Sequence, residues 1–166
     1  MFALKPISLD SIESALAKAE RYRLLNEPHE AESICRDILD VDPANRDARV
    51  SLVLALTDEL HHEPGSFARA IEAVNTLESP YDRAYYSGIA WERRAKASQG
   101  AGGPGSSNYI YDWLVKALRL FEEAERLRPS GNDDSLLRWN ACVRYLESHK
   151  DLAPQAEEAP EAILSE

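Results

Sequence analysis

Apolar and small residues recur three or four positions apart along most of the chain, the spacing of an α-helix with one buried face. No stretch alternates strictly between apolar and polar residues, as a half-exposed strand would. Prolines and glycines interrupt the pattern and mark turns. The pattern predicts seven helices, at about residues 8–25, 28–41, 44–60, 66–77, 80–98, 109–128 and 132–149. The chain is therefore expected to be all-α.

Several helix ends carry local signals. Ser8 and Ser66 are expected to cap the first and fourth helices, because a serine hydroxyl can accept from a free backbone N–H of the first turn. Pro28 suits the first turn of the second helix, where its missing N–H would have no helical partner. The pair Asp42-Pro43 ends that helix, because a residue before proline is pushed out of the α region.

Two distant segments, residues 30–43 and 116–129, share one pattern of residue types. In each segment a small residue is followed four residues later by a bulkier one, seven residues later by a smaller apolar one and twelve residues later by proline. The matching residues are Ala31, Cys35, Ile38 and Pro43 in the first segment and Ala117, Phe121, Ala124 and Pro129 in the second; between them Ala70, Val74 and Leu77 repeat the first three steps. An internal repeat of helical pairs is indicated.

These positions resemble the signature of the tetratricopeptide repeat (TPR) family. The first helices agree, with a small residue and a large one a turn later: Ala19 with Tyr22, Val53 with Leu56, and Gly88 with Trp91. The resemblance covers about residues 10–148 and implies a right-handed superhelical α-solenoid of about three TPR-like hairpins with a C-terminal capping helix. On that last helix Arg138, Arg144 and Glu147 are expected to face water. Equivalent small residues lie 39 and 47 positions apart, against a family period of about 34, so the turns within the second and third repeats are longer.

The resemblance also implies a binding surface. In this family the first helix of each pair lines a concave groove that holds an extended peptide or a helix. The matching positions here are Leu16, Glu20, Arg23, Val50, Leu54, Thr57, Tyr85, Ile89, Glu92, Arg93, Leu136, Asn140 and Arg144. Some members clamp a terminal carboxylate with basic residues, but the corresponding positions here are Leu16, Glu20 and Ser51. An amphipathic helix or an apolar segment with some acidic residues is the expected ligand.

Charge narrows the choice of partner. The net charge of −10 argues against nucleic acid and anionic membranes, and the longest aliphatic run, residues 52–56, is too short for membrane insertion. The charge is uneven: residues 1–80 carry −7, residues 81–150 carry +2 and residues 151–166 carry −5. Because most large aromatic residues also follow residue 80, the third repeat and the last helix are the expected contact surface.

The composition divides the chain into three parts: an N-terminal extension at residues 1–7, a TPR-like helical repeat domain at residues 8–149 and an acidic flexible tail at residues 150–166. The first residues lack the apolar core of a signal peptide, so a cytoplasmic location is expected.

We expect no catalytic residue, no cofactor and no bound metal. The glycine-rich run at residues 99–108 lacks the Gly-Lys-Ser/Thr ending of a phosphate-binding loop and follows a helix, so a flexible insertion is expected; an enzyme would need an unrecognised site there. His61 and His62 lie near carboxylates, but adjacent side chains on a helix end diverge by about 100°, which favours a plain surface loop. Cys35 and Cys142 are expected to be buried and inert.

Two functions remain at this point. The first is an adaptor or scaffold that binds a peptide or helix of another protein, and the groove positions favour it. The alternative is a dedicated chaperone of the export or secretion type, which would hold an aggregation-prone client, because small acidic three-repeat proteins resemble such chaperones. The sequence leaves open the identity of the partner and whether the chain forms homo-oligomers.

Overall fold

The computed structural model describes residues 2–99 and 106–152, and those residues form an all-α protein. The expectations for the glycine-rich run at residues 100–105 and for the tail at residues 153–166 lie outside the described residues. Within the described ranges, none of the helices has an apolar stretch long enough to cross a membrane. The elements are the 3-10 turn η1 (Leu9–Ser11), α1 (Ile12–Leu24), α2 (Pro28–Val41), α3 (Arg46–Asp58), the 3-10 turn η2 (Glu59–His61), α4 (Ser66–Asn75), α5 (Pro80–Ser98), α6 (Ser106–Leu127) and α7 (Asp134–Ser148).

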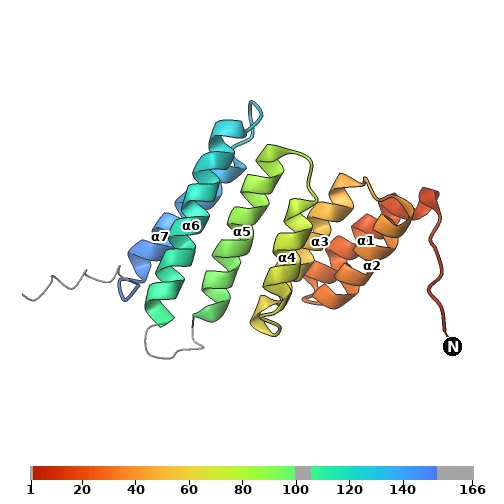
Figure 1. Ribbon diagram of the computed structural model, residues 1–166, viewed down its shortest axis with the longest axis horizontal. Helices are drawn as coiled ribbons and strands as arrows, with labels where there is room; N and C mark the ends of the chain where they lie inside the picture. The colour runs from red at the N-terminus through yellow and green to blue at the C-terminus, as the bar shows by residue number, and fades with distance from the viewer. Residues whose placement is uncertain (1, 100–105, 153–166) are drawn as a thin grey trace, which may run out of the picture.

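Each helix packs against the next one in the chain, so the described structure is a series of sequential helix pairs from α1 with α2 to α6 with α7. The contact between α5 and α6 is the most extensive in the described structure. Helix α3 also contacts α1 and α5, so it joins each pair to the next. Figure 1 shows the helices following one another in chain order from one end of the molecule to the other. The odd-numbered helices therefore meet along one continuous set of contacts.

The observed helix ends match the sequence-based expectation at α2 but differ from it at the starts of the first and fourth helices. The expected span of α2 is confirmed, with Pro28 in its first turn. The start of the first helix is different: the turn η1 comes first, and the Ser8 side chain makes no capping bond, while its carbonyl accepts from the Ser11 N–H at 3.1 Å. Ser66 is the first residue of α4 rather than its cap and is fully buried. At Ser66, burial in the packed interior has overridden the local capping preference.

Helix α3 is shorter than the sequence predicts. Asn45 caps its start, with the side-chain oxygen accepting from the Ala48 N–H at 2.9 Å. The helix ends at Asp58, and the tighter turn η2 follows it instead of two more α-helical residues. This early end places two acidic residues, Asp58 and Glu59, where the backbone changes direction.

Small residues lie where paired helices approach most closely. Ala19 of α1 and Ala31 of α2 have no exposed surface. At the crossing of α5 and α6, a Cβ atom placed on Gly88 would lie 2.5 Å from Cε1 of Phe121, which is only 1% exposed. Close packing leaves no room for a methyl group there. The position therefore requires glycine for lack of space rather than for backbone freedom.

Residue 152 belongs to the packed part of the molecule. Leu152 follows α7 and is buried in the same cluster as Ile89 and Leu114. Residues Phe2 and Leu4, in contrast, are exposed. The described part of the C-terminal segment therefore contributes to the core, although the composition assigns it to the tail.

We predict that Gly88→Ala lowers the free energy of unfolding by about 1–3 kcal/mol, because the methyl group overpacks against the Phe121 ring. Urea denaturation measures this change. Gly65→Ala is the matched control, because a Cβ there meets nothing within 4 Å. Equal stabilities of the two variants would contradict the claim of close approach, whereas partial rescue of Gly88→Ala by Phe121→Leu would support it.

Candidate functional site

A carboxylate at the end of α3 holds two guanidinium groups from neighbouring helices. Arg23 Nε of α1 donates to Asp58 Oδ2 at 2.7 Å. Arg93 Nη1 of α5 donates to Asp58 Oδ1 at 2.5 Å and to Thr57 Oγ1 at 2.7 Å. The side chains of Arg23, Asp58 and Arg93 are 18%, 22% and 25% exposed. This bridge therefore links the first three odd-numbered helices at a surface that solvent still reaches.

A second carboxylate, next to Arg93 in the sequence, joins one cation of its own helix to one of α7. Glu92 of α5 is almost fully buried, and its Oε1 accepts from Lys96 Nζ at 2.5 Å. Its Oε2 accepts from Arg138 Nη1 of α7 at 3.4 Å. Lys96 also lies over the ring of Tyr145, 5.0 Å from its centroid. The bridge extends the charged set to α7, the last helix.

We call these six residues the ionic row: Arg23, Asp58, Arg93, Lys96, Glu92 and Arg138. The row holds four cations and two carboxylates, so it carries a net charge of +2 on a chain whose total is −10. An open pocket of about 300 Å³ lies over four of the six residues, lined by Arg23, Asn26, Thr57, Asp58, His61, Arg93 and Lys96. A surface with this excess attracts anionic groups.

The environment of Arg93 reflects the excess of positive charge in the ionic row. Burial lowers the pKa of its guanidinium, Asp58 opposes this shift, and the nearby cations Arg23 and Arg138 lower the pKa further. Charges of like sign therefore crowd around Arg93. An additional carboxylate at this place would relieve that repulsion.

The structure brings together part of the sequence-predicted groove. Arg23, Leu54, Thr57 and Arg93 meet around Asp58, since Arg93 also donates to the Leu54 carbonyl at 3.3 Å. Of the whole predicted set, Val50, Thr57, Ile89 and Glu92 are buried, Leu16, Arg23, Leu54, Tyr85, Arg93 and Leu136 are half-buried, and Glu20, Asn140 and Arg144 are exposed. The buried members can support a surface but offer a partner almost no contact area.

The packing of Tyr85 and Ile89 explains why this part of the predicted groove is not open. Ile89 is 2% exposed and belongs to the cluster around Phe121. The Tyr85 ring stacks on that of Tyr81 at 5.6 Å. Burial raises the pKa of Tyr85, and the nearby Arg138 guanidinium offsets part of the rise. Both side chains therefore serve the interior of the third pair.

Sequence reasoning missed three members of the ionic row. Asp58 follows a predicted groove residue but was not assigned to the site, and its partners lie 35 residues away on each side. Lys96 had a usable signal, because Glu92 stands four residues before it on the same helix. Arg138 was expected to face water, yet it is half-buried and donates to Glu92.

The remaining candidate residues show no reactive arrangement. His61 and His62 are both exposed, as expected for a surface loop. Cys35 and Cys142 are fully buried, and burial raises their pKa values to about 11 and about 12. Both thiols are therefore protonated at neutral pH, in line with the expectation that they are inert.

Comparison of the chain with protein-family models gave no match, and neither did its comparison with curated proteins or with solved structures. Function must therefore be inferred from the residues of the site. Guanidinium and ammonium groups bind carboxylates through charge-assisted hydrogen bonds. The ionic row offers such groups beside an open pocket.

We predict that Asp58→Asn costs about 1–3 kcal/mol of stability, because it removes two charge-assisted hydrogen bonds and leaves Arg23 beside Arg93. Urea denaturation at low and high salt measures the loss, which should shrink as salt screens the repulsion. Glu78→Gln is the control, because Glu78 is 81% exposed and pairs with Arg49 at 3.3 Å. Its cost should stay within about 0.5 kcal/mol. If Asp58→Asn and Glu78→Gln lose the same amount of stability, whatever the salt concentration, this account of the ionic row is wrong.

Proposed function

We propose that this protein is a TPR-like cytoplasmic adaptor that binds an acidic segment of a partner protein along the ionic row. The architecture proposed is about three helical hairpins in a right-handed solenoid, closed by α7. The observation that carries the proposal is the charge excess of the row: four cations face two carboxylates on an otherwise acidic chain.

The packing of the signature residues supports the proposed repeat architecture. In a TPR-like hairpin, these residues lie between the two helices or between neighbouring pairs. Ala31, Cys35 and Ile38 of α2 have no exposed surface. The matching residues of α6, Ala117, Phe121 and Ala124, are likewise buried. Equivalent positions in distant helices are therefore buried alike, which supports a repeat.

The row favours a peptide over a small molecule. Its charged groups come from α1, α3, α5 and α7, so a ligand that contacts all of them must extend across several helices. The pocket over the row, about 300 Å³, can accept a side chain of such a ligand but is open rather than enclosed. An extended or helical segment with acidic residues at intervals matches this layout.

The proposal predicts that acidic peptides bind in preference to neutral ones of the same shape. The test is an immobilised array in which each amphipathic peptide is present in a glutamate version and a glutamine version. The wild-type protein should bind the glutamate versions more strongly, and added salt should reduce the difference.

A charge-matched pair of variants tests whether the ionic row is responsible. Arg23→Gln with Arg93→Gln should abolish the preference for glutamate. Arg119→Gln with Arg126→Gln removes the same charge from exposed positions on α6 and should leave the preference intact. Wild-type binding without preference for glutamate, or equal losses in both double variants, would refute the proposal. Circular dichroism shows whether each variant remains folded.

A further inference from the structure

A second charged cluster lies on α2, η2 and α4, outside the ionic row. Arg69 of α4 is at its centre: Nη1 donates to Glu32 Oε1 at 2.8 Å, and Nη2 donates to Glu59 Oε2 at 2.7 Å and to Glu63 Oε2 at 3.1 Å. Arg36 Nη2 also donates to Glu32 Oε1, at 2.5 Å. Glu59 is 1% exposed and Glu32 is 8% exposed. These two carboxylates are therefore desolvated, whereas the side chains of Arg36 and Glu63 are about half exposed.

The charges of this cluster do not balance. Three carboxylates face two guanidinium groups, so the guanidinium groups alone leave one negative charge uncompensated. Burial raises the pKa of Glu59 to about 7, and the neighbouring Glu32 carboxylate contributes to the rise. Burying an ionised carboxylate is costly unless it is fully paired. The shortage of positive charge is therefore located at Glu59.

One oxygen of Glu59 has no hydrogen-bond partner. Arg69 contacts only Oε2, whereas Oε1 is buried and unpartnered among the described residues. This oxygen points towards the imidazole of His29, whose Nδ1 lies 3.2 Å from it. An unpaired buried polar atom carries a full desolvation penalty. The direction of Oε1 thus marks the place where a cation is missing.

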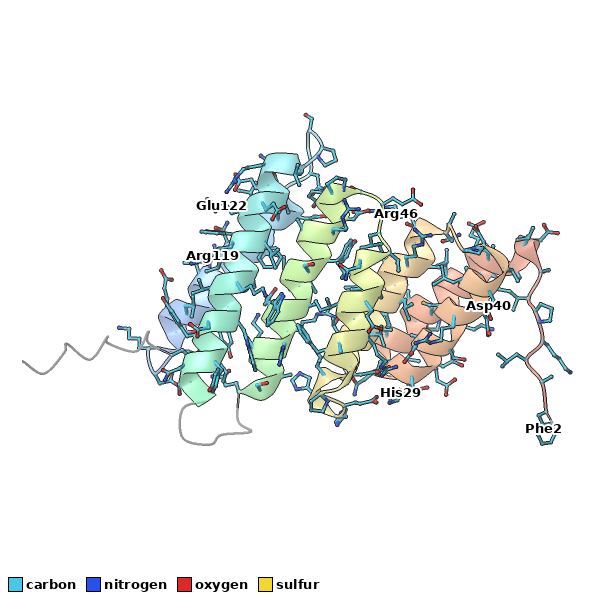
Figure 2. All side chains as sticks on the ribbon, in the orientation of Figure 1. Phe2, His29, Asp40, Arg46, Arg119 and Glu122 are labelled. Carbon is cyan, nitrogen blue, oxygen red and sulfur yellow. The ribbon has the colours of Figure 1, made fainter. Side chains whose placement is uncertain are left out.

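Three side chains converge on that place. His29, Glu59 and Glu63 each offer one ligand atom, and these atoms lie within 4.8 Å of one another. The imidazole of His29 is 67% exposed, so an ion can enter from solvent without opening the core. Figure 2 shows the labelled His29 along the lower edge of the molecule in this view.

From this geometry we propose that His29, Glu59 and Glu63 bind a divalent metal ion of the zinc class. Arg69 holds the Oε2 atoms of both glutamates with one nitrogen, and hydrogen bonds of this kind commonly orient ligating carboxylates. An imidazole with two carboxylates suits Zn²⁺, whereas Mg²⁺ prefers oxygen ligands alone. Water completes the coordination on the exposed side of His29.

Neither histidine of the 61–62 loop belongs to this site. His29 looks like an ordinary exposed residue in the first turn of its helix, and Glu59 lies 30 residues further along the chain. No local spacing therefore signals the cluster. The sequence predicted no metal ligand, and the proposal departs from that expectation.

The test is titration of the tag-free full-length protein with Zn²⁺ in a calorimeter, after treatment with EDTA and desalting. The wild type should bind one ion per chain. His29→Ala and Glu59→Gln should each weaken binding by roughly tenfold or more, because each removes a ligand. His62→Ala is the matched control and should bind as the wild type does. Mg²⁺ at the same concentrations should give no saturable heat.

Several outcomes would overturn the proposal: no saturable Zn²⁺ binding, unchanged affinity in His29→Ala, or loss of binding in His62→Ala. Equal binding of Mg²⁺ would reject the zinc class. His29→Ala keeps the test valid even if Glu59→Gln unfolds, because the His29 imidazole is exposed. Circular dichroism of each variant confirms that a loss of binding is not a loss of fold.

Discussion

Two helix pairs of this chain pack closely where two small residues, or a glycine and a ring, let their backbones approach. Ala19 and Ala31 provide the contact between α1 and α2, and Gly88 lies directly against Phe121 between α5 and α6. None of these helices can bury its apolar face alone, so each depends on its partner. Because the α5–α6 contact is the most extensive, it also provides the surface on which α7 and Leu152 are buried.

Charged contacts between helices follow from this pairing. When one pair packs on the next, acidic side chains at the junction lose water and need cations from the facing element. Arg46 of α3 holds the buried Asp82 of α5 through two bonds, of 2.7 and 2.8 Å, and Arg138 of α7 holds Glu92 of α5. Such pairs withdraw carboxylates from the surface. The ionic row itself keeps an excess of two positive charges, although the chain as a whole carries −10.

The sequence predicts features that depend on residues close together in the chain, and it misses contacts between residues that are far apart. The span of α2 follows from Pro28 and from Pro43 beyond its end, and the buried small residues follow from a period repeated within each helix. In the candidate site, Arg23 and Arg93 are among the positions that the resemblance to the TPR family implies. Their shared partner Asp58 lies 35 residues from each, and no local spacing encodes that pairing. Ser66 failed as a cap for a related reason, since its burial depends on contacts that its neighbours in sequence do not reveal.

The end of α3 shows how one constraint can produce two opposite charge imbalances. Asp58 and Glu59 lie where the helix dipole is negative, which disfavours carboxylates and requires cations nearby. Successive helical residues point about 100° apart, so the two carboxylates draw their cations from different sides. On the Asp58 side two guanidinium groups face one carboxylate, and the surplus is positive. On the Glu59 side carboxylates outnumber guanidinium groups, and the surplus is negative. An anionic peptide on one side and a metal cation on the other would correct opposite imbalances that arise at the same helix end.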